Sequence, residues 1–121
     1  MALFDGPRIA ARANADPEMR IAARLWDGSI RLEADAERCD FAVRGGVLSA
    51  EPVKEPAVLV SGPVAGWREM LAAVPRPFYQ DLMAAQAHHG FRVTGGESAL
   101  YPYYPAMRRL VELLRALASE A

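Results

Sequence analysis

The hydrophobic pattern predicts two short helices at the start of the chain. In the first, Asp5-Gly6-Pro7 precedes residues 8–13, and a proline in the first turn costs no backbone hydrogen bond, so a helix is expected to start here and to end near Asn14. Asp16-Pro17-Glu18 repeats this signal, and the apolar residues that follow it have helical spacing. A strand over 21–25 is the alternative, because Asp27-Gly28 is also a strong hairpin signal.

From Ser29 onward the hydrophobic period changes from that of a helix to that of a strand. Apolar residues alternate with polar ones over 29–34 and over 39–44, and Gly45-Gly46 supplies a tight turn before 47–50. This pattern predicts an antiparallel meander. Prolines interrupt the chain over 52–56, and residues 57–60 then form a short, fully apolar strand that we expect in the interior of the sheet.

Helices are predicted to cover one face of this sheet. One begins after Ser61-Gly62-Pro63, and its apolar stripe consists of Val64, Trp67, Met70, Leu71 and Val74. Pro75-Arg76-Pro77 ends it and starts another helix, which stops at Gly90. That helix is expected to carry two rows, formed by Phe78, Leu82 and Ala85 and by Tyr79, Met83 and Gln86.

A second hairpin and a long helix complete the predicted order. Phe91 and Val93 are expected to face inward, with a turn at Gly95-Gly96 and a returning strand over 98–101. The last helix starts at about Tyr103 or Pro105, and its regular stripe comprises Met107, Leu110, Val111, Leu114 and Leu117. Strands and helices in this order predict an α+β sandwich in which helices pack on one sheet.

Composition places the chain among ordinary globular proteins. Its 121 residues fit one domain over 1–121, with 52% hydrophobic residues, 24% charged residues and a net charge of −1. That charge does not favour nucleic acid as a partner. The chain has no apolar run long enough for a transmembrane segment and no basic, apolar leader at its start, so we expect a cytoplasmic protein. Lys54 is the only lysine, a bias typical of GC-rich bacterial genes.

The residue types that carry catalysis or bind metal form no recognisable motif. His88-His89 are neighbours that point about 100° apart on a helix, so they do not chelate one metal ion, and they suit the negative end of the helix dipole. Cys39 is the only cysteine, which excludes an internal disulfide, and it is expected to be an inert buried thiol. We therefore predict no catalytic residue, no metal site and no cofactor.

Aromatic and methionine side chains are concentrated in the C-terminal half of the sequence. Methionines adapt their shape to irregular apolar cavities, so this composition is typical of a pocket for a hydrophobic ligand. A well-filled core would have the same composition. The pattern alone leaves both interpretations open.

Several segments resemble the sterol-binding domain of the type-2 sterol carrier protein family. They are 40–47 with its glycine turn, 57–62, 67–71 and 91–96, and the stretches 14–18 and 26–30 look like the start of small bacterial members. The resemblance implies a curved, mainly antiparallel five-stranded sheet covered on one face by helices that enclose an apolar tunnel. The chain departs from the family in lacking a C-terminal peroxisomal address, and the aromatic segment 101–105 is expected to reshape the tunnel mouth.

Together these observations predict a carrier for a fatty acyl, sterol or other lipid-like ligand, working as a monomer or a homodimer. The alternatives are a small enzyme that uses His88, His89, Asp81 or a tyrosine as acid or base, and a noncatalytic protein-interaction module. The expected ligand-binding residues lie on the helical stripes and the second hairpin. They are Trp67, Met70, Leu71, Phe78, Tyr79, Leu82, Met83, Phe91, Met107, Leu110 and Leu114.

Overall fold

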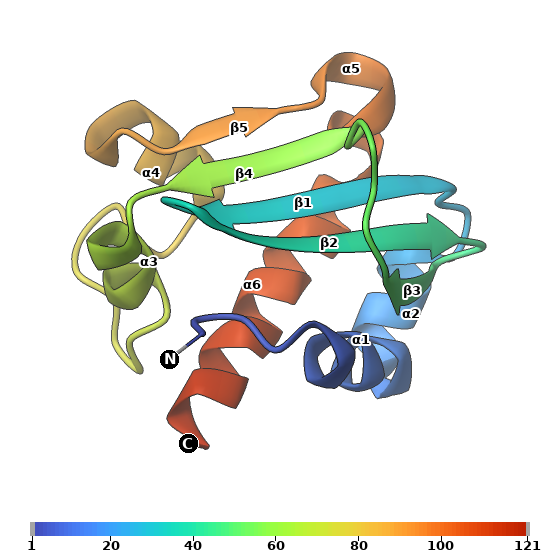
Figure 1. Cartoon of the computed structure of the whole chain (residues 1–121), viewed down its shortest axis with the longest axis horizontal. Coiled ribbons are helices and arrows are strands. Elements are labelled where there is room, and N and C mark those ends of the chain that lie inside the picture. Colours follow the sequence, from blue (N-terminus) through green and yellow to red (C-terminus); the bar gives the residue numbers. More distant parts are fainter. Residues whose placement is uncertain (1, 121) are drawn as a thin grey trace.

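A five-stranded sheet with helices against one face organises the protein (Figure 1). The computed structural model describes residues 2–120. The elements follow in the order α1 (Gly6–Ala15), α2 (Pro17–Ala23), β1 (Gly28–Ala34), β2 (Glu37–Arg44), β3 (Val47–Ala50), β4 (Val58–Gly62), α3 (Val64–Met70), α4 (Leu82–His89), β5 (Arg92–Thr94), α5 (Gly96–Ala99), a 3₁₀ turn (Tyr101–Tyr103) and α6 (Tyr104–Ser119). Within the described part of the chain, no helix is long and apolar enough to cross a membrane.

The two N-terminal helices form as predicted because aspartates cap both of them. Asp5 accepts a hydrogen bond from the backbone N–H of Arg8 at the start of α1, and Asp16 accepts one from Met19 at the start of α2. A proline follows each cap in the first turn. The alternative strand over 21–25 is wrong, since α2 extends to Ala23 and the next strand begins only at Gly28.

The sheet has the strand order β3-β2-β1-β4-β5 and is mainly antiparallel, as expected. β1, β2 and β3 form the predicted meander, with Ile30 opposite Phe41 and Val43 opposite Leu48. β4 lies parallel to β1, so that Ile30 also lies opposite Val58. The chain therefore crosses from one edge strand, β3, over the meander before it enters the interior strand β4.

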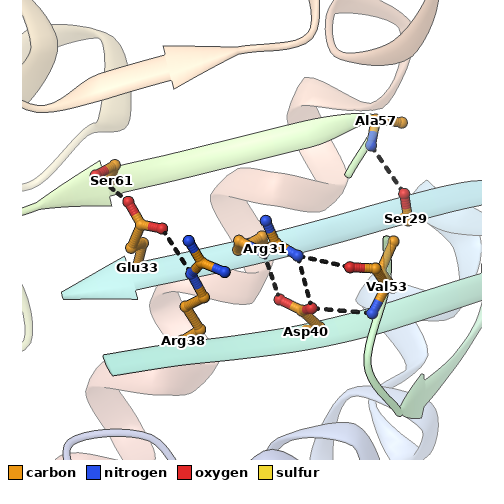
Figure 2. A network of polar contacts seen from close by, with 8 residues as sticks. All are labelled: Ser29, Arg31, Glu33, Arg38, Asp40, Val53, Ala57 and Ser61. Carbon is orange, nitrogen blue, oxygen red and sulfur yellow. Dashed lines mark hydrogen bonds and ion pairs between the residues drawn. The ribbon is translucent and has the colours of Figure 1, made fainter. Parts of the chain in front are cut away.

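A cluster of ion pairs and hydrogen bonds on the outer face of the sheet fastens this crossing segment (Figure 2). Arg31 of β1 and Asp40 of β2 form a two-bond ion pair at 2.9 and 3.1 Å. Both then bind Val53, because the Arg31 guanidinium donates to its carbonyl and the Asp40 carboxylate accepts from its N–H. The N–H of Ala57 donates to the hydroxyl of Ser29. The backbone groups of Val53 and Ala57 lie outside any strand, and these bonds satisfy them.

The opposite face carries the hydrophobic core. Inward residues of β1, β2 and β4 are buried, and α3 and α6 contribute Trp67, Met70 and the predicted α6 stripe. The Phe91 ring packs edge-on against Trp67, with ring centroids 5.4 Å apart, and lies over two glycines, Gly62 and Gly66. A side chain at either glycine would collide with that ring. The core thus depends on glycine as well as on large residues.

Two predicted elements are wrong. The helix expected from Phe78 begins only at Leu82, where Asp81 is the N-cap. The helix before it, α3, ends at Met70, so Val74 is 86% exposed rather than part of the buried stripe expected for that helix. Phe78 has a positive φ of 69°, which is incompatible with a helix. The returning strand expected over 98–101 does not form either. The chain instead enters the short helix α5 at Gly96, which leaves β5 as the edge of the sheet.

Candidate ligand-binding site

A partly open cavity of about 180 Å³ lies between the N-terminal segment, α1 and the last turns of α6. Most of its wall is apolar, and two charged residues, Asp5 and Arg8, complete it. In Figure 1 the N-terminal segment runs across α6 toward α1, and α3 lies to its left. The lining residues are Ala2, Leu3, Asp5, Arg8, Ile9, Leu71, Leu114, Leu117 and Ala118.

Glu37 holds the N-terminal segment in place as one wall of this cavity. Its two carboxylate oxygens accept hydrogen bonds from the backbone N–H groups of Leu3 and Phe4, each at 2.9 Å. Phe4 is buried and packs edge-on against Trp67, with ring centroids 5.0 Å apart. Leu3 lines the cavity together with Leu114 and Leu117 of α6. Leu3 and Phe4 are therefore a fixed part of the site, because their backbone hydrogen bonds and the packing of the Phe4 ring hold them.

The apolar side of the cavity continues into the core along α6. Leu117 and Leu114 line the cavity, and both belong to the stripe that leads inward to Leu110 and Met107. These residues recur every three or four positions, so they lie in one row on the helix. On the other side, Leu71 directly follows Met70, whose side chain is fully buried. The cavity is therefore the outer end of an apolar row that extends into the core.

Arg8, a lining residue, belongs to a group of charged side chains beside the cavity. One oxygen of Glu120 accepts hydrogen bonds from Arg8 at 3.1 Å and from Arg12 at 2.8 Å. These two arginines hold the pKa of the Glu120 carboxyl below its usual range, Arg12 having the larger effect. Glu120 follows the last turn of α6, and both arginines belong to α1. The ion pairs thus join α1 to α6 beside an otherwise apolar opening.

The structure distributes the predicted ligand-binding residues over several places. Leu71 and Leu114 line the cavity at the end of α6, whereas Leu82 lines a smaller hollow beside Asp81 and Arg108. Phe78 and Tyr79 lie with His89 around a surface hollow, and Met83 is partly buried against the core. The remaining predicted residues are core side chains packed under the sheet: Trp67, Met70, Phe91, Met107 and Leu110.

Both histidines stack on aromatic rings. His88 lies over Phe78 with ring centroids 3.9 Å apart, and His89 lies over Tyr79 at 3.7 Å. His89 Nε2 also lies 2.9 Å from the carbonyl oxygen of Pro77. They occupy the last turn of α4, the position expected for side chains that suit the helix dipole. The histidines thus fasten the segment before α4 rather than border the cavity at α6.

Three other polar groups have unusual surroundings. Tyr104 donates a hydrogen bond to Asp81, and burial together with this carboxylate raises the pKa of Tyr104 to about 12. Burial raises the pKa of the Cys39 thiol to about 12 as well. Arg115 donates through Nε to the carbonyl of Met70, and desolvation lowers the pKa of its guanidinium, whose Nη2 is buried without a hydrogen-bond partner among residues 2–120. Across residues 2–120, no three His, Cys, Asp or Glu side chains are grouped to hold a metal ion.

Sequence reasoning missed the N-terminal half of this cavity. The apolar face of α1 offered a signal, because Ile9, Ala10 and Ala13 have helical spacing and are buried. Leu3 and Arg8 offered none, since their positions depend on Glu37 and Glu120, which lie far away in the sequence. The aromatic segment expected to reshape a tunnel mouth lies at the other end of α6, where Tyr103 stacks on Trp26.

The fold defines a class: a mixed five-stranded sheet with helices packed against one face, as in sterol carrier protein 2. By sequence, the chain matches no family model and no curated protein. A crystal structure of sterol carrier protein 2 has a TM-score of 0.73 and 20% identity, covering 95% of this chain and 98% of that one. The expected resemblance is therefore confirmed for the fold.

Two further solved structures share this fold. One is a solution structure from Thermus thermophilus, described as a conserved hypothetical protein and possibly a sterol carrier protein, with a TM-score of 0.64, 22% identity and coverage of 97% of this chain and 90% of that one. The other is the ubiquinone synthesis protein UbiJ-SCP2, with a TM-score of 0.58, 13% identity and coverage of 90% of each chain. At these identities the comparisons establish the fold alone.

Proposed function

We propose that the protein is a noncatalytic binding or carrier module for a small lipid-like molecule, which enters through the cavity at the end of α6. The observation that carries this proposal is the continuous apolar row from Leu117 and Leu114 to Leu110 and Met107, which connects an opening at the surface to the core. The shared fold supports it, because one neighbour is named as a sterol carrier protein.

The size of the cavity favours a narrow ligand. At about 180 Å³ the cavity is smaller than the roughly 300–1,000 Å³ typical of sites for drug-sized molecules, so it accepts an alkyl chain more readily than a ring system. Burial of about 100–200 Å² of such a chain at about 25 cal/mol per Å² is worth about 2.5–5 kcal/mol before the cost of ordering. This gain is sufficient for reversible binding of the kind a carrier needs.

A longer ligand would require the core to adapt. The predicted residues beyond the cavity include three methionines, Met70, Met83 and Met107, and methionine changes its rotamer at little cost. We propose that these side chains move to extend the cavity between sheet and helices, with Trp67, Leu110 and Phe91 as the inner wall. The depth of this extension determines the chain length that the protein accepts.

A cavity-blocking variant tests the proposal. Ala118 is exposed, lines the mouth and has space beside it, so Ala118→Phe fills the opening without disturbing the core. Ala116→Phe is the matched control, because Ala116 is exposed on the same helix and is not among the lining residues. Binding of a fluorescent fatty-acyl probe is measured by the quenching of tryptophan emission. Trp67 is a suitable reporter because its ring packs against Phe4, in the segment that forms one wall of the cavity.

We expect saturable quenching at micromolar probe in the wild type and in Ala116→Phe, and at least a tenfold weaker response in Ala118→Phe. Mass spectrometry of a solvent extract of the purified protein then identifies the chemical class of any ligand that copurifies. Absence of quenching in the wild type up to the solubility of the probe, together with an empty extract, would refute the carrier function. Unchanged binding in Ala118→Phe would show that the ligand enters elsewhere.

A further inference from the structure

We propose that the ligand of this cavity carries an anionic head group, and that the carboxylate of Glu120 occupies the place of that group in the ligand-free protein. This inference rests on the proposed function, because it assigns the polar end of a molecule whose apolar end lies between α1 and α6. It makes Arg8 and Arg12 the residues that select charged amphiphiles over neutral ones.

The geometry of the mouth supports this assignment. Arg8 lines the cavity, and its guanidinium also binds Glu120 at 3.1 Å, so this side chain contacts both the apolar space and the carboxylate. Arg12 lies four residues further along α1, hence on the same helical face, and binds the same oxygen at 2.8 Å. Two guanidinium groups thus converge on one carboxylate oxygen beside the cavity, which Arg8 lines.

The contact with Glu120 is readily exchanged. Arg8, Arg12 and Glu120 are 48%, 36% and 43% exposed, so their ion pairs are open to water and weak. Glu120 also lies at the C-terminal end of α6, where the helix dipole disfavours a negative charge. A ligand carboxylate that replaces Glu120 keeps both arginines paired and moves this negative charge away from the helix end.

The other acidic residue at the mouth does not compete for the arginines. The Asp5 carboxylate accepts the backbone N–H of Arg8 at 3.2 Å and thereby caps α1. When Glu120 moves away, two positive charges, Arg8 and Arg12, face this single negative charge. Counted over residues 2–120, the charges beside this apolar cavity are then net positive, which is the arrangement expected for an amphiphile with a carboxylate or another small anion at one end.

The test compares two ligands that differ only in their head group. Octanoate and 1-octanol have the same chain length, and calorimetry measures their binding to the wild type, Arg8→Gln and Glu120→Gln. Arg68→Gln is the matched control, since Arg68 is an exposed arginine of α3 outside the lining of this cavity. Thermal unfolding of each variant checks that these surface changes leave the fold intact.

We expect the wild type to bind octanoate more tightly than octanol. Arg8→Gln weakens octanoate binding about fivefold and Glu120→Gln strengthens it by a similar factor, as is typical of exposed charge pairs, while octanol binding changes much less than octanoate binding in both variants. Octanoate binding also weakens as salt is added. Arg68→Gln behaves as the wild type does.

The result that overturns this inference is distinct from the one that refutes the carrier function. Equal binding of octanoate and octanol in the wild type, or equal effects of Arg8→Gln on both, would remove the head-group assignment and leave the apolar cavity as a lipid site. Failure of both ligands to bind, together with failure of the fatty-acyl probe, would instead contradict the proposed function itself.

Discussion

Replacement of Asp16 by asparagine would separate two roles of one side chain. Asp16 caps α2 through the N–H of Met19, and it also binds Arg109 of α6 through two hydrogen bonds of 2.8 and 2.9 Å. Asparagine is an equally good cap, so Asp16→Asn keeps the first role and removes the charge of the second. Arg109 retains Glu112 at 3.1 Å, so the substitution leaves no cation isolated.

The structure gives the magnitude and the sign of the effect. The hydrogen bonds from Arg109 lower the pKa of Asp16 from 3.8 to about 2. At about 1.36 kcal/mol for each tenfold change in proton affinity, this difference corresponds to at most about 2.5 kcal/mol. Water reaches 27% of the Arg109 side chain and 11% of that of Asp16, and its screening reduces the expected contribution to about 1 kcal/mol.

Because the folded-state pKa is the lower one, this stability is present above the unfolded-state value and is lost as the pH falls toward about 2. Urea unfolding at several pH values measures it. Asp16→Asn should be less stable than the wild type by about 1 kcal/mol near neutral pH, and the difference should shrink on acidification. Asp5→Asn is the control, since Asp5 caps α1 and has no arginine at ion-pair distance within residues 2–120. A difference that stays constant down to about pH 2 would refute the reasoning.

Three further outcomes test the packing. Leu114→Asp places a charge at a core position that is 3% exposed, so we expect thermal unfolding to show a loss of about 3–5 kcal/mol in the free energy of unfolding. Ala116→Asp, on the exposed side of α6, should change this free energy little. A normal melting curve for Leu114→Asp would show that α6 is peripheral. Gly62→Ala brings a Cβ within 2.6 Å of the Phe91 ring and should cost about 1–3 kcal/mol in urea, which an unchanged midpoint would contradict. Cys39, 8% exposed and with its pKa raised to about 12, should react with a thiol reagent far more slowly in the native protein than in urea, and equal rates would show that its strand opens readily.

Local signals predicted those elements whose causes are local. The caps Asp5 and Asp16, the alternation from Ile30 to Val43 and the stripe of α6 all act between residues close in the sequence, and each element formed as expected. The late start of α4 also had a local cause, the cap at Asp81, which the helical spacing from Phe78 concealed because three apolar residues also fit one helical face.

Tertiary contacts determined those elements and parts of the candidate site that local signals did not predict. Gly95-Gly96 has the positive φ values of a tight turn, but the segment that follows folds into α5 and buries Leu100 instead of pairing with the edge strand β5. For the candidate site, the α6 and Leu71 walls were predictable from apolar spacing. The opposite wall was not, because Glu37 fixes Leu3 from 34 positions away in the sequence and Glu120 fixes Arg8 from 112 positions away.

The fastened segment between β3 and β4 has a consequence for the order of folding. Arg31 and Asp40 belong to neighbouring strands of one hairpin, so their ion pair can form as soon as β1 meets β2. Val53 can then bind this pair before β4 has docked, and the bound segment shortens the free loop that must close to bring Val58 alongside Ile30. Parallel pairing between distant strands is slow to nucleate. The outer-face cluster thus acts on the rate at which the sheet is completed as well as on its final stability.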